Sequence, residues 1–249
     1  MTAEQQHPLE PIFYPRSVAV VGVSTDEAKA HMSFLATLID SGFPGPLYPV
    51  HPTVGEVMGL KAYPTVVDIP GPVDHVIVSV PREVVPKVMA QCGEKGVHSA
   101  HIFTSGFGEI GRDYGRQLEE EVVRVARAGG VRIIGPNCMG LYCPASGLAF
   151  VAGLPRESGP FAFISQSGGN ATDVAHTAKV RGLYFSKGIS YGNAADLKGG
   201  DFLDYLAADP DTRIVAAYIE GVADGPRFFD AAKRLAREKP LIFFKGGLT

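Results

Sequence analysis

The sequence predicts an α/β protein made of two consecutive domains, each with a mainly parallel sheet covered by helices. Short runs rich in β-branched residues alternate with helix-length segments along almost the whole chain, which is the pattern of repeated β-α-β units. The stretch Val151–Pro160 interrupts this pattern with two glycines and two prolines. With 249 residues, 45% of them apolar, the chain is long enough for two cores. We therefore expect domains over residues 1–152 and 153–249.

The expected elements follow from these runs in order. Strands are predicted at Val18–Val23, Leu47–Val50, His75–Val80, Ser99–Thr104, Arg132–Ile134, Phe161–Ser165, Phe185–Ser190, Ile214–Ile219 and Leu241–Lys245. Apolar residues at spacings of three and four predict amphipathic helices, most clearly at Glu83–Lys95, Tyr114–Ala128 and Phe228–Glu238. A parallel strand normally leads into a loop and a covering helix, and only four residues follow the last predicted strand. The second domain is thus expected to be incomplete at its C-terminus, as a fragment or as a subunit completed by another chain.

Charge and cysteine content exclude several classes of function. The 26 acidic and 23 basic side chains leave a net charge of −3, without the basic block that marks a nucleic-acid or membrane-surface partner. The three cysteines are too few and too irregularly spaced for a disulfide framework or a zinc site, so buried thiols and no bound metal are expected. No run reaches the roughly 18 apolar residues of a membrane span, and no secretory leader is recognisable. We expect a cytoplasmic protein.

The strand ends of the first domain carry the residues expected to bind a ligand. Gly22 lies where the first strand turns toward its helix, so that backbone amides can face a phosphate, although a simple tight turn is the alternative. The next four strands end on proline or glycine, in the segments Tyr48–Pro52, Val78–Pro81, Thr104–Gly108 and Gly135–Cys138. Because open α/β sheets bind ligands beyond the carboxyl ends of their strands, these segments predict a nucleotide-sized cleft.

Two motifs of the second domain favour an anion and its chemistry. Small hydroxyl and glycine residues at Ser165–Asn170 precede the helix-like segment Ala171–Lys179, so free amides and the positive end of the helix dipole could face an anion; an ordinary helix cap is the alternative. Glu220 follows an apolar strand and is succeeded by a glycine. A carboxylate there can accept the ring N–H of a histidine, although a solvated loop acid is the plainer interpretation.

The order of these motifs resembles one known family. GVS, YPVHP, GLKAYP, SVP, TSGF and GPNCMG occur in the order found in the CoA-binding domain of ADP-forming acetyl-CoA synthetases and of the succinyl-CoA synthetase α-subunit. The resemblance covers essentially the whole chain and implies a Rossmann-like CoA-binding domain followed by a flavodoxin-like domain of the succinyl-CoA synthetase type.

The resemblance also implies roles for individual residues. The phosphates of CoA would be held by Gly22, Val23, Ser24 and Lys29. Its adenine and pantetheine arm would be flanked by Val50, His51, Pro52, Ser79, Val80, Pro81, Thr104, Ser105, Gly106 and Asn137. His51 stands where the family usually has asparagine, and imidazole can still donate a hydrogen bond. A phosphoryl group would be cradled by Ser165, Ser167, Gly168 and Gly169, and Glu220 matches the family glutamate that orients the phosphorylated histidine.

The family's nucleophilic histidine follows a segment like Lys245–Gly247 and is absent from this sequence. We therefore expect the CoA-binding portion of an acyl-CoA synthetase that joins an acid to CoA with cleavage of ATP to ADP and phosphate, inactive in isolation. ATP, ADP and Mg²⁺ would bind only through an ATP-grasp domain or β-subunit, and a homo-oligomer is possible. The alternative is a non-catalytic CoA-binding regulatory or scaffold module. An NAD-dependent dehydrogenase is disfavoured because the spacing is not GxGxxG.

Overall fold

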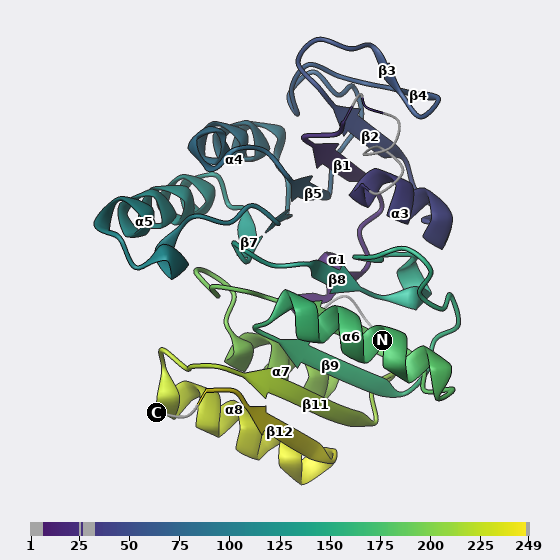
Figure 1. Ribbon diagram of the computed structural model, residues 1–249, viewed down its shortest axis with the longest axis vertical. Coiled ribbons are helices and arrows are strands. Elements are labelled where there is room, and N and C mark those ends of the chain that lie inside the picture. The colour runs from purple at the N-terminus through teal and green to yellow at the C-terminus, as the bar shows by residue number, and fades with distance from the viewer. Residues whose placement is uncertain (1–6, 25, 27–32, 248–249) are drawn as a thin grey trace.

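The computed structural model describes residues 7–24, 26 and 33–247 and contains two five-stranded sheets, one above the other in Figure 1. The first sheet is parallel throughout and has the order β2-β1-β5-β6-β7. Its strands are β1 (Val18–Val21), β2 (Leu47–Val50), β5 (His75–Val78), β6 (Ser99–Ile102) and β7 (Arg132–Ile134). Every residue of β1, β5 and β6 is buried, as expected for a parallel sheet covered on both faces.

Helices on the two faces of this sheet explain the burial. On one face, α4 (Val85–Lys95) and α5 (Asp113–Ala128) share an apolar core with Ala19, Val21 and their neighbours. On the other face, α3 (Phe34–Ser41) packs with Val18 and Val20. Short elements complete the domain: α1 (Glu10–Phe13), the hairpin β3 (Glu56–Val57) and β4 (Leu60–Lys61), and the 3₁₀ turns η2 (Arg82–Val84), η3 (Gly108–Ile110) and η4 (Pro144–Ser146).

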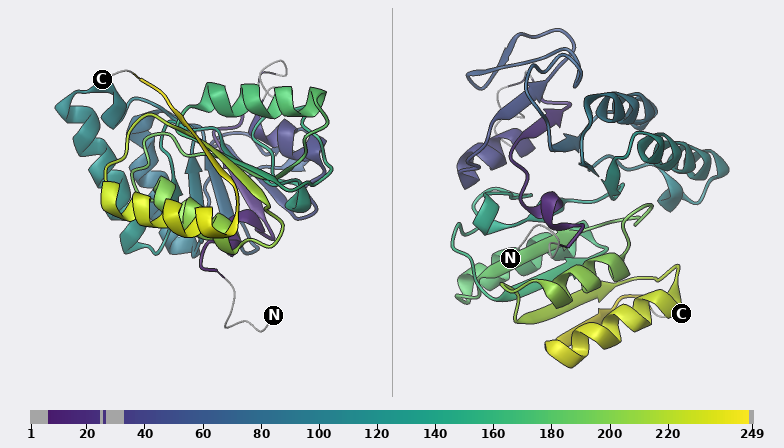
Figure 2. Two further views of the ribbon diagram at one scale, coloured as in Figure 1. Left: turned by 90° about the horizontal axis from the view of Figure 1, so that it is seen from below. Right: turned by 180° about the vertical axis from the view of Figure 1, so that it is seen from behind.

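The second sheet has the order β12-β11-β9-β10-β8. Its strands β9 (Phe161–Ser165), β10 (Phe185–Ser190), β11 (Ile214–Ile219) and β12 (Leu241–Lys245) are parallel, whereas β8 (Gly140–Tyr142) runs antiparallel to β10. The helix α6 (Gly168–Val180) covers one face, and α7 (Gly199–Ala208) and α8 (Gly225–Glu238) cover the other (Figure 2). Both sheets thus have the α/β architecture that the sequence predicts.

The two sheets are not separated at residues 152 and 153. β8 precedes this point and already belongs to the second sheet, and the Phe13 ring of α1 stacks on Tyr205 of α7 at 4.4 Å. A single apolar core runs from Val18 of the first sheet to Leu203 of the second domain. The two sheets are therefore joined by continuous packing, and the boundary at residues 152 and 153 stays a prediction.

A loop after β10 fastens the second domain to the first. The backbone amides of Asn193, Ala195 and Leu197 donate to the carbonyls of Pro136, Gly135 and Ile133 at 3.0 to 3.2 Å. The buried carboxylate of Asp196 accepts hydrogen bonds from Arg132 Nε at 2.8 Å, from the Ile133 amide at 3.0 Å and from Arg127 at 3.2 Å. Burial alone would raise the pKa of Asp196, but these donors hold the pKa below its usual value.

The remaining sequence-level expectations concern thiols and membrane spans. The three cysteines are buried and free, and burial raises the pKa of Cys92 to about 12. Among the helices that the structure describes, none is both long enough and apolar enough to cross a membrane.

Candidate functional site

A cleft of about 870 Å³ lies between the carboxyl ends of the two sheets. Three segments of the first domain line it, namely Ser79–Glu83, Phe103–Ser105 and Asn137–Met139. The second domain contributes Gln166–Gly169 and Glu220. The cleft therefore brings together residues predicted separately for the nucleotide and for the phosphoryl group.

A second cavity of about 540 Å³ adjoins the cleft beside β1. Its lining includes the predicted residues Gly22, Val23 and Ser24. Ser79, Phe103 and Met139 line both cavities, so the two cavities adjoin at these residues. Phe103 is 42% exposed and makes an edge-to-face contact with Phe34, with ring centroids 5.2 Å apart. The region shared by the two cavities therefore has apolar side chains as well as polar strand ends.

The turn at Gly22 is fixed by close packing against the end of β5. Gly22 has φ +94°, and a Cβ at this position would lie 2.2 Å from the Ser79 carbonyl oxygen. Only glycine fits here, both for its backbone conformation and for the space. The tight-turn interpretation and the ligand-binding interpretation are thus compatible, because the same turn lines the cavity.

The ends of β5 and β6 are tied to each other across the cleft wall. Thr104 Oγ1 donates to the Val80 carbonyl at 2.7 Å, and Arg82 donates to the Gly106 carbonyl at 3.1 Å. Arg82 also bonds Glu83 at 2.8 Å, which raises the pKa of its guanidinium. Gly106 braces this wall without lining the cavity, whereas Thr104 and Ser105 line it.

Some predicted residues lie outside both cavities. The backbone of His51 pairs with Tyr63, and its Nδ1 accepts from the Thr53 amide at 3.3 Å; neither it nor Val50 and Pro52 lines a cavity. Lys29 lies outside the described residues. The CoA contacts expected of these four residues stay predictions.

The start of α6 presents backbone donors to the cleft. Ser167 caps the helix, because its Oγ accepts from the Asn170 amide at 3.3 Å. Within the part of the chain that the structure describes, the amides of Gly168 and Gly169 have no hydrogen-bond partner, as is usual in a first helical turn. These amides and the helix dipole favour an anion. Ser165 is buried, and its hydroxyl donates to the Ser167 carbonyl at 2.7 Å, so it shapes the turn instead of lining the cleft.

Glu220 projects from the end of β11 as an exposed carboxylate on the cleft wall. Its backbone is held on two sides. Gln166 Oε1 accepts from the Glu220 and Gly221 amides at 2.6 and 2.9 Å, and Lys245 Nζ donates to the Glu220 carbonyl at 3.0 Å. The carboxylate itself stays available to a partner from solvent.

Sequence reasoning missed six residues of the cleft wall, namely Arg82, Glu83, Phe103, Cys138, Met139 and Gln166. They lie within or directly beside segments that were singled out, but their types carried no signal, as with an arginine after SVP, a methionine after GPNC and a glutamine between two serines. Their place on the wall follows from where the strands end.

Comparison with known proteins shows which families the two domains match. Residues 16–144 match the family described as CoA binding domain, and residues 158–249 match the family described as succinyl-CoA ligase like flavodoxin domain. The chain belongs to the CoA-binding domain family. The CoA-binding match ends just after β8, and the two matches leave residues 145–157 between them, which include the predicted boundary.

Relatives of this CoA-binding chain are similar over nearly its whole length. It is 41% identical to the ADP-forming acetate-CoA ligase I of Archaeoglobus fulgidus, over 96% of this chain and 35% of the relative. It is 41% identical to the α-subunit of the ADP-forming acetate-CoA ligase II of Pyrococcus furiosus, over 96% of this chain and 52% of the relative. The chain thus spans about a third to a half of the curated relatives it matches.

A solved structure has the same fold. The apo form of the acetyl-coenzyme A synthetase 1 of Candidatus Korarchaeum cryptofilum superposes with a TM-score of 0.89 at 41% identity, covering 97% of this chain and 53% of the other. The predicted Rossmann-like domain, the flavodoxin-like domain and the family resemblance are confirmed.

Proposed function

We propose that this chain binds coenzyme A and is the CoA-binding portion of an ADP-forming acyl-CoA synthetase. The intact enzyme would convert an acid, CoA and ATP into acyl-CoA, ADP and phosphate. One observation carries the proposal: strand ends of the CoA-binding domain share one cleft with the free amides of Gly168 and Gly169 and with the Glu220 carboxylate.

The residues present fit CoA. The Gly22 turn is a backbone cradle that any side chain would fill, and it lines a cavity that shares Ser79, Phe103 and Met139 with the main cleft. A long ligand with a phosphorylated end, an arm of alternating alkyl and amide groups and a reactive end suits two adjoining cavities of this kind. When bound, CoA supplies the thiol that accepts the acyl group.

In this proposal the second domain handles the phosphoryl group. The N–H groups of Gly168 and Gly169 hold its oxygens at the positive end of α6, where no solvent reorganisation is needed. The Glu220 carboxylate accepts the N–H of a histidine ring that the rest of the intact enzyme supplies. This contact fixes the tautomer of the ring, so that its other nitrogen takes the phosphoryl group. Ser165 supports this turn through its hydrogen bonds to Ser167.

The partners and location of the protein belong to the same proposal. The name of the Pyrococcus furiosus relative includes an α-subunit, which supports a partner that binds ATP, ADP and Mg²⁺, either an ATP-grasp domain or a β-subunit. We place the division of the chain at residues 152 and 153 and the protein in the cytoplasm. A homo-oligomer is among the assemblies that we propose.

The alternative is a CoA-binding module without catalysis of its own. One observation favours it for the isolated chain: no histidine is found among the described residues that line the cleft. A chimera that joins this chain to the remaining part of the Archaeoglobus fulgidus ligase separates the two, because acyl-CoA formation from ATP, Mg²⁺, CoA and acetate would contradict the module.

Calorimetric titration with CoA tests the proposal, with NADH as the control ligand. We expect CoA to bind and NADH to give no heat beyond dilution. A chain that is folded by circular dichroism and yet fails to bind millimolar CoA would overturn the proposal.

A further inference from the structure

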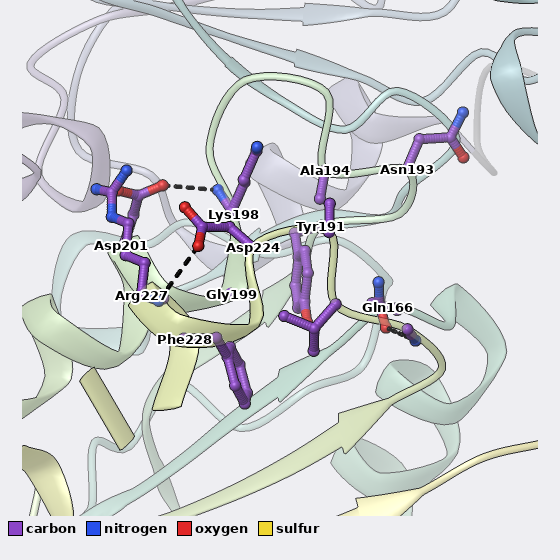
Figure 3. Close-up of a pocket in the computed structure, with 14 residues that line it drawn as sticks. Gln166, Tyr191, Asn193, Ala194, Lys198, Gly199, Asp201, Asp224, Arg227 and Phe228 are labelled. Carbon is purple, nitrogen blue, oxygen red and sulfur yellow. Dashed lines mark hydrogen bonds and ion pairs between the residues drawn. The ribbon is translucent and has the colours of Figure 1, made fainter. Parts of the chain in front are cut away.

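Gln166 lies in the turn between β9 and α6, at a point where two cavities meet. It lines the main cleft and also a smaller cavity of about 80 Å³ formed by the loops after β10 and β11 and the starts of α7 and α8 (Figure 3). Several charged groups of the smaller cavity have partners on α7 and α8. Arg227 is paired with Asp201, and Asp224 caps α8 by accepting from the Arg227 amide at 3.2 Å. Gln166 lies apart from this charged group in Figure 3.

Three hydrogen bonds tie Gln166 to the end of β11. Its backbone amide donates to the Tyr218 carbonyl at 3.2 Å, which continues the pairing of β9 with β11 by one residue. Its side-chain oxygen then accepts from the amides of both Glu220 and Gly221, at 2.6 and 2.9 Å. The side chain thus takes over where the strand pairing stops, and it spans the gap between the α6 turn and the Glu220 turn.

The two backbone donors also fix the orientation of the side-chain amide. A nitrogen at the position of Oε1 would face two N–H groups and could accept from neither, so the oxygen must be placed there. The NH₂ group therefore points away from the Glu220 turn. Among the residues that the structure describes, it has no hydrogen-bond partner, and the residue lines the cleft next to Ser167, Gly168 and Gly169.

We propose that Gln166 is a phosphoryl-binding residue whose NH₂ group donates to the anion held by the Gly168 and Gly169 amides, with its orientation set by the Glu220 turn. The inference rests on the proposed function and adds to it a side-chain donor. It also links the Glu220 turn to the anion site, because one side-chain amide serves both. Its oxygen holds the Glu220 backbone, and this contact orients its NH₂ group toward the anion.

Three variants separate the two ends of the amide. Gln166→Glu keeps an acceptor for the Glu220 and Gly221 amides, removes the donor and adds a charge that repels phosphate. Gln166→Ala removes both ends. Gln117→Glu, on the exposed surface of α5 and outside the lining of both cavities, makes the same chemical change and is the matched control.

The test measures two quantities on the 249-residue chain. Amide hydrogen exchange at Glu220 and Gly221 reports the anchor, and titration with inorganic phosphate at low ionic strength reports the donor. We expect Gln166→Ala to speed exchange at both amides about tenfold, while Gln166→Glu leaves them protected. We expect phosphate affinity to fall about tenfold or more in Gln166→Glu and severalfold in Gln166→Ala, and to stay unchanged in Gln117→Glu.

The roles of Gln166 as donor and as anchor can be contradicted separately. Unchanged phosphate affinity in Gln166→Glu, or no phosphate binding by a wild-type chain that binds CoA, would overturn the donor. Unchanged amide exchange in Gln166→Ala would overturn the anchor. Failure of the wild-type chain to bind CoA is a different result and counts against the proposed function itself.

Discussion

The two walls of the cleft are both made at the carboxyl ends of parallel strands, but they offer different chemistry. The first-domain wall is mainly neutral, with Phe103 and Met139 beside polar strand ends, and its Arg82 and Glu83 are paired with each other at 2.8 Å. The second-domain wall has free amides at the start of α6 and the exposed carboxylate of Glu220. Parallel strand ends provide a place for a ligand, whereas the helix start adds a preference for charge. We expect the first wall to set CoA affinity and the second to set anion affinity.

The largest expected effect is a loss of stability when the contact between the two domains at Asp196 is broken. Asp196→Ala leaves Arg127, Arg132 and the Ile133 amide without their shared buried acceptor, so we expect a loss of about 3 kcal/mol in the free energy of unfolding. Urea unfolding measures this loss. The control is Asp204→Ala, which breaks an exposed pair with Arg234 and should cost less than about 0.5 kcal/mol.

The same carboxylate gives stability a pH dependence of known sign. The pKa of Asp196 is lower in the folded protein than its ordinary value of 3.8, so its contribution to stability is complete above that value and is lost as the pH falls through the folded pKa. In Asp196→Asn this contribution is missing, and stability should fall less steeply with acidification below pH 3.8. Parallel acid-unfolding curves for wild type and variant would contradict the account.

The next effect is expected in the second cavity, beside β1. Gly22→Ala places a methyl group against the Ser79 carbonyl and forces alanine to a positive φ, so we expect CoA affinity to fall roughly a hundredfold by displacement of the turn. Gly59→Ala is the matched control, since Gly59 also has a positive φ but has open space around its Cβ position. Phosphate affinity should not change in Gly22→Ala; a parallel loss would mean that the two walls do not act separately.

A smaller effect is expected on the second wall, where helix capping and anion binding can be distinguished. Ser167→Ala removes the cap of α6 and should cost about 1 kcal/mol in the free energy of unfolding. Ser167→Asp keeps an acceptor for the Asn170 amide and should preserve stability, but its carboxylate competes with phosphate, whose affinity should fall about tenfold. Thermal unfolding and phosphate titration check the pair. Undiminished phosphate binding in Ser167→Asp would show that this end of α6 is not an anion site.

The smallest effect is expected at His51. Because this side chain lines neither cavity, His51→Asn should change CoA affinity less than about threefold. A tenfold change in a CoA titration would mean that the end of β2 contacts the ligand after all.

Much of the fold could be predicted from sequence, because buried parallel strands appear as short apolar runs. The runs at Leu47–Val50 and Ile214–Ile219, for example, have the predicted bounds. The run at Val18–Val23 was predicted two residues too long, since Gly22 leaves the sheet to form the turn against Ser79. β8 was missed because an antiparallel strand of three residues, among glycines, has too short a pattern to detect.

The candidate site was predictable in part, for a similar reason. Glycine, proline and serine identify the strand ends and the SQSGG turn in the sequence. The structure brings Ser79, Thr104 and Ser167 from these segments to one cleft. Asp196 and Gln166 act through groups 54 to 69 positions away, which no local pattern encodes. Their roles depend on how two domains and two strand ends pack, and only the folded chain shows this.

The most direct test of the account maps CoA contacts by NMR on the isotope-labelled chain during one titration. We predict that amide resonances of Gly22, Val80 and Gly168 shift together with a single affinity, because all three line the two adjoining cavities. Shifts confined to the first domain, or no shift at all, would contradict the claim that the two domains form one binding cleft.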